Sequence, residues 1–118
     1  MHFEVVTSKR DGWTVVSVIG ELDLATAPAL RQRVVTLVTE GYNHLLVDLG
    51  ATDFLDSIGL GVLVGALKRV EQSGGELVVM TDVQRIRQVF ELTRLDNIVS
   101  IYPDVDSAVA ALGQRRHE

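Results

Sequence analysis

The first twenty residues carry a pattern of apolar and polar positions that is typical of paired strands. Residues 3–8 are rich in β-branched side chains, and residues 13–19 are apolar on both faces. Between these runs, residues 9–12 have the sequence Lys-Arg-Asp-Gly, a turn in which Gly12 supplies a positive φ. The pattern predicts an antiparallel hairpin whose second strand lies inside a sheet.

Beyond Gly20, apolar residues recur at the spacing of one helix face, and these helical stretches are separated by short apolar runs. The first helix is expected to have Thr26 as its N-cap and Pro28 in its first turn, and to end at Gly41. Its apolar stripe is Ala27, Leu30, Val34 and Leu37. Later helices are expected at residues 57–73, at residues 83–93 with Asp82 as the cap, and from Asp104 to Leu112. Buried strands are expected at residues 45–49, 77–80 and 98–101, and a connection at residues 51–56.

The alternation of these elements decides the topology. Strands that are joined through helices run parallel, and such crossovers are right-handed. The sequence therefore predicts an α/β fold: a mixed, mostly parallel sheet that is led by an antiparallel hairpin and packed with about four helices.

Composition and charge narrow the functional classes. The 118 residues are 47% apolar and 23% charged, which fits one globular domain over residues 1–118 with a polar tail from about residue 113. The absence of Cys excludes disulfides, thiolate zinc sites and Cys nucleophiles. The net charge of −5, with Arg115-Arg116 at the frayed end as the densest basic spot, argues against binding to nucleic acid or anionic lipid. No basic amino-terminal segment and no long apolar run is present, so a cytoplasmic location is expected.

Asp53 to Gly65 is the most unusual segment, with the sequence Asp-Phe-Leu-Asp-Ser-Ile-Gly-Leu-Gly-Val-Leu-Val-Gly. It follows a predicted parallel strand and opens a helix, which is where α/β sheets commonly place ligands. Ser57 stands where an N-cap belongs, and capping an orphan N–H would suffice to explain a serine there. The alternative is that its hydroxyl is presented to a partner.

Three glycines in the first turns of this helix favour the alternative, because glycine costs about 1 kcal/mol against alanine in a helix interior. Gly61 and Gly65 share one face, and we expect them to allow close packing of the helix on the sheet. Gly59 lies in the first turn, where packing explains it less well. We expect it to leave the turn bare, so that a partner can approach Ser57 closely.

Enzymatic interpretations of this segment fail. A nucleophile elbow needs Gly where Leu55 stands, and His44 begins a strand at the opposite end from Ser57. A P-loop needs Lys where Ala66 stands, and the dinucleotide fingerprint needs Gly where Val64 stands. No catalytic residue is predicted.

Acidic residues near this segment do not have metal-ligand spacing. Asp53 and Asp56 lack a neighbouring His or further acid, and they instead keep the start of a helix polar. A second cluster, Gly20-Glu21-Leu22-Asp23, also follows a strand and precedes a helix. Asp23 is either a solvated loop acid or part of a surface that it shares with Ser57.

These motifs resemble the STAS domain of anti-sigma factor antagonists, the small bacterial proteins of sporulation and general stress control. The resemblance rests on Gly20-Glu21-Leu22-Asp23, on Asp56-Ser57-Ile58-Gly59-Leu60-Gly61-Val62-Leu63 and on Gly74-Gly75-Glu76-Leu77. It covers nearly the whole chain. The helix start at Thr26 and residues 62–69 look especially like actinobacterial members.

The resemblance implies a binding module and not an enzyme, with no cofactor and no metal. Ser57 is implied to be phosphorylated by a partner anti-sigma factor that is itself a serine kinase of the histidine-kinase-like ATPase fold. The unphosphorylated form would bind this kinase and free the sigma factor, and a PP2C-type phosphatase would reset the switch. Ile58 departs from relatives that carry a second Ser or Thr at this place. The implied partner-binding residues are Glu21, Asp23, Asp56, Ser57, Ile58, Gly59, Leu60 and Gly61.

A phosphate on Ser57 would act by charge. It adds about 1.5 to 2 negative charges, which the N-terminus of a helix tolerates although Asp53 and Asp56 oppose them. The fold is therefore expected to change little, while a partner packed against Ile58 and Leu60 would meet a charge costing several kcal/mol. One alternative is a regulatory domain that binds a nucleotide or another small anion at the same helix N-terminus. A triad hydrolase is a distant third.

Overall fold

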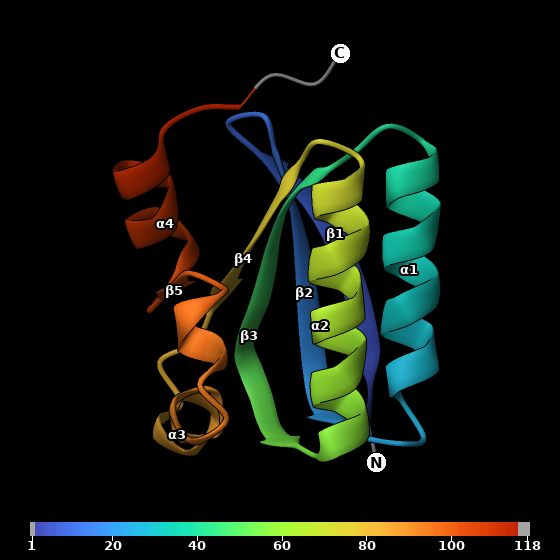
Figure 1. Cartoon of the computed structure of the whole chain (residues 1–118), viewed down its shortest axis with the longest axis vertical. Coiled ribbons are helices and arrows are strands. Elements are labelled where there is room, and N and C mark those ends of the chain that lie inside the picture. The colour runs from blue at the N-terminus through green and yellow to red at the C-terminus, as the bar shows by residue number, and fades with distance from the viewer. Residues whose placement is uncertain (1, 116–118) are drawn as a thin grey trace.

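Residues 2–115 are described by a computed structural model, and they form the predicted mixed sheet (Figure 1). The five strands follow chain order across the sheet; β1 pairs antiparallel with β2, and the remaining pairs are parallel. The strands are β1 (Glu4–Arg10), β2 (Trp13–Leu22), β3 (His44–Leu55), β4 (Glu76–Met80) and β5 (Ile101–Tyr102). The predicted α/β class is confirmed.

The helices divide between the two faces of the sheet (Figure 1). Alternate strand residues such as Val16 and Val47 belong to the main core with α1, α2 and α3, whereas Trp13 and Leu46 face α4. The helices are α1 (Ala27–Thr39), α2 (Ser57–Gln72), α3 (Gln84–Leu92) and α4 (Val105–Leu112), with a 3-10 turn at Leu95–Asn97. The predicted stripe of α1 is confirmed, because all four of its members are buried.

The hairpin turn and two helix ends also match the expectation. Asp11 and Gly12 both have positive φ, the conformation of a two-residue turn that matches strand twist. Gly41 follows α1 with positive φ. Asp104 caps α4 by accepting a hydrogen bond from the Ser107 N–H at 2.7 Å.

The third strand is longer than predicted. Residues 51–55, expected to be a connection, continue β3 and pair with the end of β2. Thr52 is fully buried there and donates a hydrogen bond to the Val18 carbonyl at 2.8 Å, so a polar side chain occupies an internal strand. Because Thr52 and the adjacent Asp53 are polar, the pattern of apolar runs did not predict this part of the strand. The extension carries the start of α2 out to the carboxyl end of the sheet.

The third helix and the last strand also begin elsewhere than predicted. Asp82 does not cap α3; the N-cap position is held by Val83, whose N–H donates to the Thr81 hydroxyl oxygen at 3.1 Å. The strand expected at residues 98–101 begins later and is shorter: it covers Ile101–Tyr102, because the chain before it turns through the 3-10 segment.

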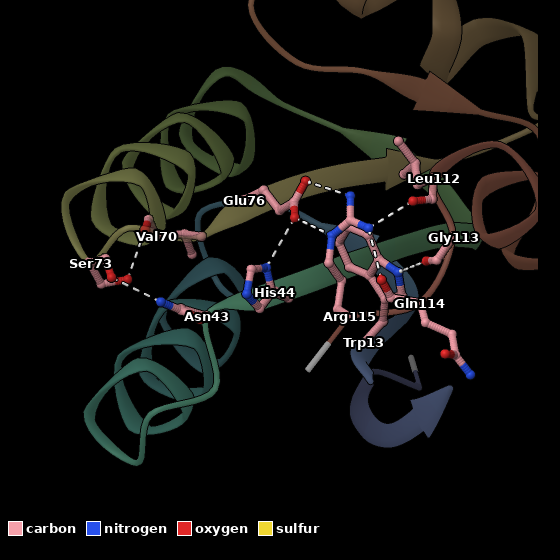
Figure 2. Close-up of polar contacts among 10 residues, drawn as sticks. All are labelled: Trp13, Asn43, His44, Val70, Ser73, Glu76, Leu112, Gly113, Gln114 and Arg115. Carbon is pink, nitrogen blue, oxygen red and sulfur yellow. Dashed lines mark hydrogen bonds and ion pairs between the residues drawn. The ribbon is translucent and has the colours of Figure 1, made fainter. Parts of the chain in front are cut away.

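The end of the chain at Arg115-Arg116 was predicted to be frayed, and this is wrong for Arg115. Figure 2 shows the Arg115 guanidinium beside the Glu76 carboxylate and over the Trp13 ring, with its carbon Cζ 4.6 Å from the ring centroid. The Trp13 indole N–H donates to the Gly113 carbonyl at 2.9 Å. The Arg115 N–H donates to the Asp11 carbonyl at 2.8 Å, and the tail lies so close to the hairpin turn that a Cβ on Gly12 would overlap it. Arg116 lies outside the described residues.

His44 completes this cluster at the amino end of the sheet, where β2, β3 and β4 begin. Its Nδ1 atom lies 3.1 Å from Glu76 Oε2, and its ring meets the Trp13 ring edge-on at 6.0 Å (Figure 2). The Arg115 hydrogen bonds hold the pKa of Glu76 below its ordinary value. A network of this kind joins the tail to three strands, although its members are far apart in the sequence.

Candidate functional site

The predicted site residues lie together at the carboxyl end of the sheet, where β2 and β3 end. The register pairs Leu22 with Leu55, so the two chain segments leave the sheet side by side. Asp23 follows β2, and Asp56 follows β3 and stands directly before α2. The segments that carry Asp23 and Ser57 therefore lie side by side, as a shared surface would require.

The helix cap is Asp56 and not Ser57, which corrects the expectation. Asp56 Oδ1 accepts a hydrogen bond from the Gly59 N–H at 2.8 Å, and its Oδ2 accepts from the Leu24 N–H at 3.1 Å. One carboxylate thus caps α2 and holds the loop before α1 against it. The carboxylate wins over the serine because it lies one residue earlier, in the extended conformation that an N-cap adopts.

Asp23 shapes the loop in which it lies. Its Oδ1 accepts hydrogen bonds from the Ala25 N–H at 3.0 Å and the Thr26 N–H at 3.2 Å. Thr26 holds the N-cap position of α1 as predicted, but its hydroxyl does not cap the helix: it donates to the Glu21 carbonyl at 2.7 Å. The hydrogen bonds of both side chains close the turn between β2 and α1. Glu21 lies half-buried near the end of β2 beside Phe54.

Ser57 is the first residue of α2, and its side chain is exposed. Within residues 2–115, no hydrogen-bond partner of its hydroxyl is found. Because Asp56 performs the capping, Ser57 is not needed to satisfy the first turn. The hydroxyl is therefore presented to solvent at the positive end of a helix.

The glycines of α2 have the opposite roles from those predicted. Gly59 is buried, and a Cβ on it would lie 2.5 Å from the Leu22 carbonyl oxygen. Its lack of a side chain lets the first turn of α2 pack against the end of β2. A Cβ on Gly61 or Gly65 would meet nothing within 4 Å. Packing on the sheet thus explains Gly59 and does not explain the other two.

Exposed apolar residues occur in the segments next to Ser57, and two of them were missed from the sequence. Ile58 is 47% exposed, as its predicted role requires, whereas Leu60 is only half-buried and packs on the core. Leu24 is 70% exposed and Phe54 is 48% exposed. Leu24 follows Asp23 and Phe54 follows Asp53, each in a segment that was predicted to be a loop. An apolar residue next to an acid in a predicted loop was the signal that could have identified them. Phe54 pairs in register with Glu21, whereas the next pair, Leu22 and Leu55, belongs to the core beneath α1 and α2, so Phe54 points to the other face of the sheet. We refer to Leu24, Ser57 and Ile58 as the docking surface.

Neither a candidate metal-binding cluster nor a candidate membrane-spanning helix is found among the described residues. Among residues 2–115, no three His, Cys, Asp or Glu side chains come close enough to hold a metal ion. No helix in the same range combines the length and apolar character that crossing a bilayer requires.

Comparisons with known proteins identify relatives of this chain. The family profile described as the STAS domain matches residues 4–108. Two anti-sigma-B factor antagonists are similar: that of Bacillus subtilis is 34% identical over 101 residues, covering 86% of this chain and 92% of the relative. That of Staphylococcus aureus is 33% identical over 101 residues, covering 86% and 94%. The crystal structure of an anti-sigma factor antagonist from Mycobacterium paratuberculosis superposes with a TM-score of 0.85 at 34% identity and covers 94% of both chains.

Proposed function

The chain belongs to the STAS-domain family, and from this premise we propose that it is an anti-sigma factor antagonist controlled by phosphorylation of Ser57. In the proposed cycle, the unphosphorylated protein binds an anti-sigma factor with serine kinase activity and so releases a sigma factor. Phosphorylation then ends the binding. The observation that carries the proposal is an exposed Ser57 whose helix is capped by its neighbour Asp56, with exposed Ile58 next to it and exposed Leu24 in the loop that Asp56 holds.

The phosphoryl transfer requires little from this chain. The Ser57 oxygen would attack the γ-phosphorus of ATP, ADP would leave, and the hydroxyl proton would pass to a base on the kinase. Asp56 is a poor candidate for that base, since each of its carboxylate oxygens already accepts a backbone N–H. In this proposal Asp56 and Asp23 are positioning residues: they hold the two loops that present Ser57 and Leu24.

Apolar contact and charge explain the two states. Leu24 and Ile58 offer a partner apolar area that is exposed in the free protein. A phosphate at Ser57 would stand beside that area with about 1.5 to 2 negative charges. Burying it against a partner would cost several kcal/mol, and each 1.4 kcal/mol is tenfold in affinity. The switch needs no change of fold.

The reverse step is assigned to a PP2C-type phosphatase, which would hydrolyse the exposed phosphoserine. In this role the protein acts in the cytoplasm, without a cofactor and without direct contact to nucleic acid.

Incubation with the cognate kinase and Mg-ATP, followed by mass spectrometry, tests the proposal. One phosphate on Ser57 is expected. Ser73 provides the matched control, because it is an exposed serine at the other end of α2 and should remain unmodified. An unchanged mass together with reversible nucleotide binding would instead favour the regulatory domain that binds a small anion.

Two variants separate a switch from a purely structural serine. Ser57→Ala cannot be phosphorylated and should bind the kinase persistently. Ser57→Asp places one charge on a shorter arm and should weaken binding by about 1 to 3 kcal/mol, less than phosphorylation does. Equal kinase affinity of the two variants would contradict the proposal.

A further inference from the structure

A groove runs between α1 and α2 and opens beside Ser57. Its volume is about 270 Å³, and Ser57 and Ile58 line the end that adjoins the docking surface. Val34 from α1 and Val62 and Ala66 from α2 form its apolar lining. We call this feature the interhelical groove. In Figure 1, α1 and α2 lie side by side over one face of the sheet and begin at the same end of the molecule.

The groove is hollow because two of its lining residues have no side chain. Gly61 and Gly65 line it, and a Cβ on either would meet nothing within 4 Å. Alanine would therefore fit inside the folded chain, and it would stabilise the helix by about 1 kcal/mol at each position. No contact among the described residues requires these glycines. Their effect is to keep open a depression that adjoins the docking surface.

The charge of the groove is opposite to that of the whole chain. Arg31 on α1 and Arg69 on α2 line it, and among the described residues no acidic side chain does. Within residues 2–115, neither guanidinium has an ion-pair or hydrogen-bond partner. The chain as a whole carries a net charge of −5. The chain as a whole repels an acidic ligand, but the groove does not. A ligand that fits the groove must complement two arginines and an apolar lining.

We propose that the interhelical groove receives an acidic, amphipathic segment of the same anti-sigma factor that docks at Ser57. Small apolar side chains of that segment contact Val34, Val62 and Ala66, and its carboxylates pair with Arg31 and Arg69. This inference rests on the proposed function, because it adds a second contact region for one partner. The groove would set the register of the partner, while the docking surface around Ser57 carries the switch.

A charge-reversal pair tests the inference on the intact protein. Arg69→Glu places a carboxylate in the groove, whereas Lys68→Glu makes the same change of charge at the adjacent exposed residue, which does not line the groove. Binding of the unphosphorylated protein to its cognate anti-sigma factor is measured by titration calorimetry. We expect Arg69→Glu to weaken binding about tenfold, and more so when combined with Arg31→Glu, because like charges then face one another. Lys68→Glu should stay within about twofold of wild type, and the Arg69→Glu defect should shrink as salt screens the charges.

A steric variant tests the shape of the groove independently. Gly65→Leu fills the groove and should bind weakly, while its melting temperature should be no lower than that of wild type. Equal affinities of Arg69→Glu and Lys68→Glu, or unimpaired binding by Gly65→Leu, would overturn the inference. Sedimentation of the protein alone identifies another occupant: if Arg69→Glu changes its oligomeric state, the groove holds a second copy of this chain and the inference is wrong.

Phosphorylation of Ser57 in the same samples separates this inference from the proposed function. Suppose that wild type is phosphorylated, that Ser57→Asp weakens binding and that all groove variants bind normally. These results refute the role of the groove and leave the proposed function standing. A wild-type protein that neither binds the kinase nor is phosphorylated refutes both.

Discussion

The two ends of the sheet use polar residues in opposite ways. At the amino end, Trp13 is fully buried beneath Arg115, and Glu76 pairs with both Arg115 and His44 (Figure 2). At the carboxyl end, the carboxylates of Asp23 and Asp56 bond to backbone N–H groups, and Ser57 is left exposed. The first end joins side chains to one another; the second holds loops in place and presents a hydroxyl.

In this comparison, the denser polar network is the one that holds the tail, and the proposed site lies at the other end of the sheet. The cluster at the amino end contains a histidine, a carboxylate, an arginine and the only tryptophan, yet its contacts fasten a tail over a buried ring. The carboxyl end has fewer contacts between side chains, and Leu24, Phe54 and Ile58 are exposed there. In the proposed function, the hydroxyl of Ser57 is available to a partner because Asp56 satisfies the first turn of α2 in its place.

The largest expected effect is on stability at the amino end. Trp13→Ala should destabilise the fold by about 3 to 5 kcal/mol, because it removes a fully buried ring and the groups packed on it. Urea unfolding followed by circular dichroism measures this loss. At a temperature where the variant is folded, its affinity for the anti-sigma factor should equal that of wild type. A loss of affinity by the folded variant would break the separation between the two ends.

At the carboxyl end, Gly59→Ala should lower stability by about 1 to 3 kcal/mol, because the added methyl meets the Leu22 carbonyl. Gly61→Ala, two residues further along α2, is the control and should raise stability by up to about 1 kcal/mol. Thermal unfolding of the two variants measures both the loss of stability in Gly59→Ala and the gain in Gly61→Ala. A stable Gly59→Ala variant would return that residue to a role in docking.

The capping assignment predicts a smaller effect. Asp56→Ala should destabilise by about 1 to 2 kcal/mol, since it removes the acceptor of the Gly59 N–H. Asp56→Asn should retain most of that stability, because asparagine is an equally good cap. Ser57→Ala should change the melting temperature least of the three. A greater loss in Ser57→Ala than in Asp56→Ala would show that the serine is the cap after all.

The smallest effect concerns pH at the amino end. The pKa of Glu76 is lowered, chiefly by the hydrogen bond from Arg115, so its ionised form favours the folded state. That stability is present above the ordinary glutamate pKa of about 4.3 and is lost as the pH falls through the lowered value. The melting temperature of wild type should exceed that of Glu76→Gln by a constant margin at neutral pH, and the margin should shrink below about pH 4.3. Solvent screening limits the pair to about 1 kcal/mol. A margin that grows in acid would contradict this assignment.

Much of the fold was readable because its determinants are local. The hairpin turn at Asp11-Gly12, the apolar stripe of α1 and the Asp104 cap each depend on residues within a few positions of one another. Residues 51–55 were misread for the same reason: Thr52 appears polar locally, but its hydroxyl is satisfied by Val18 on a neighbouring strand.

The polar residues of the candidate site were predictable from the sequence, but their structural roles were not. The sequence by itself determined that Asp23, Asp56 and Ser57 lie where a strand ends and a helix begins, because periodicity and the parallel crossover rule require it. Only the tertiary structure decided that Asp56 caps α2 and bonds to the Leu24 N–H, so that Ser57 is free to be presented. It likewise decided that Gly59, and not Gly61, touches β2. These distinctions depend on distances between segments far apart in the chain, and a local pattern of residue types does not encode such distances.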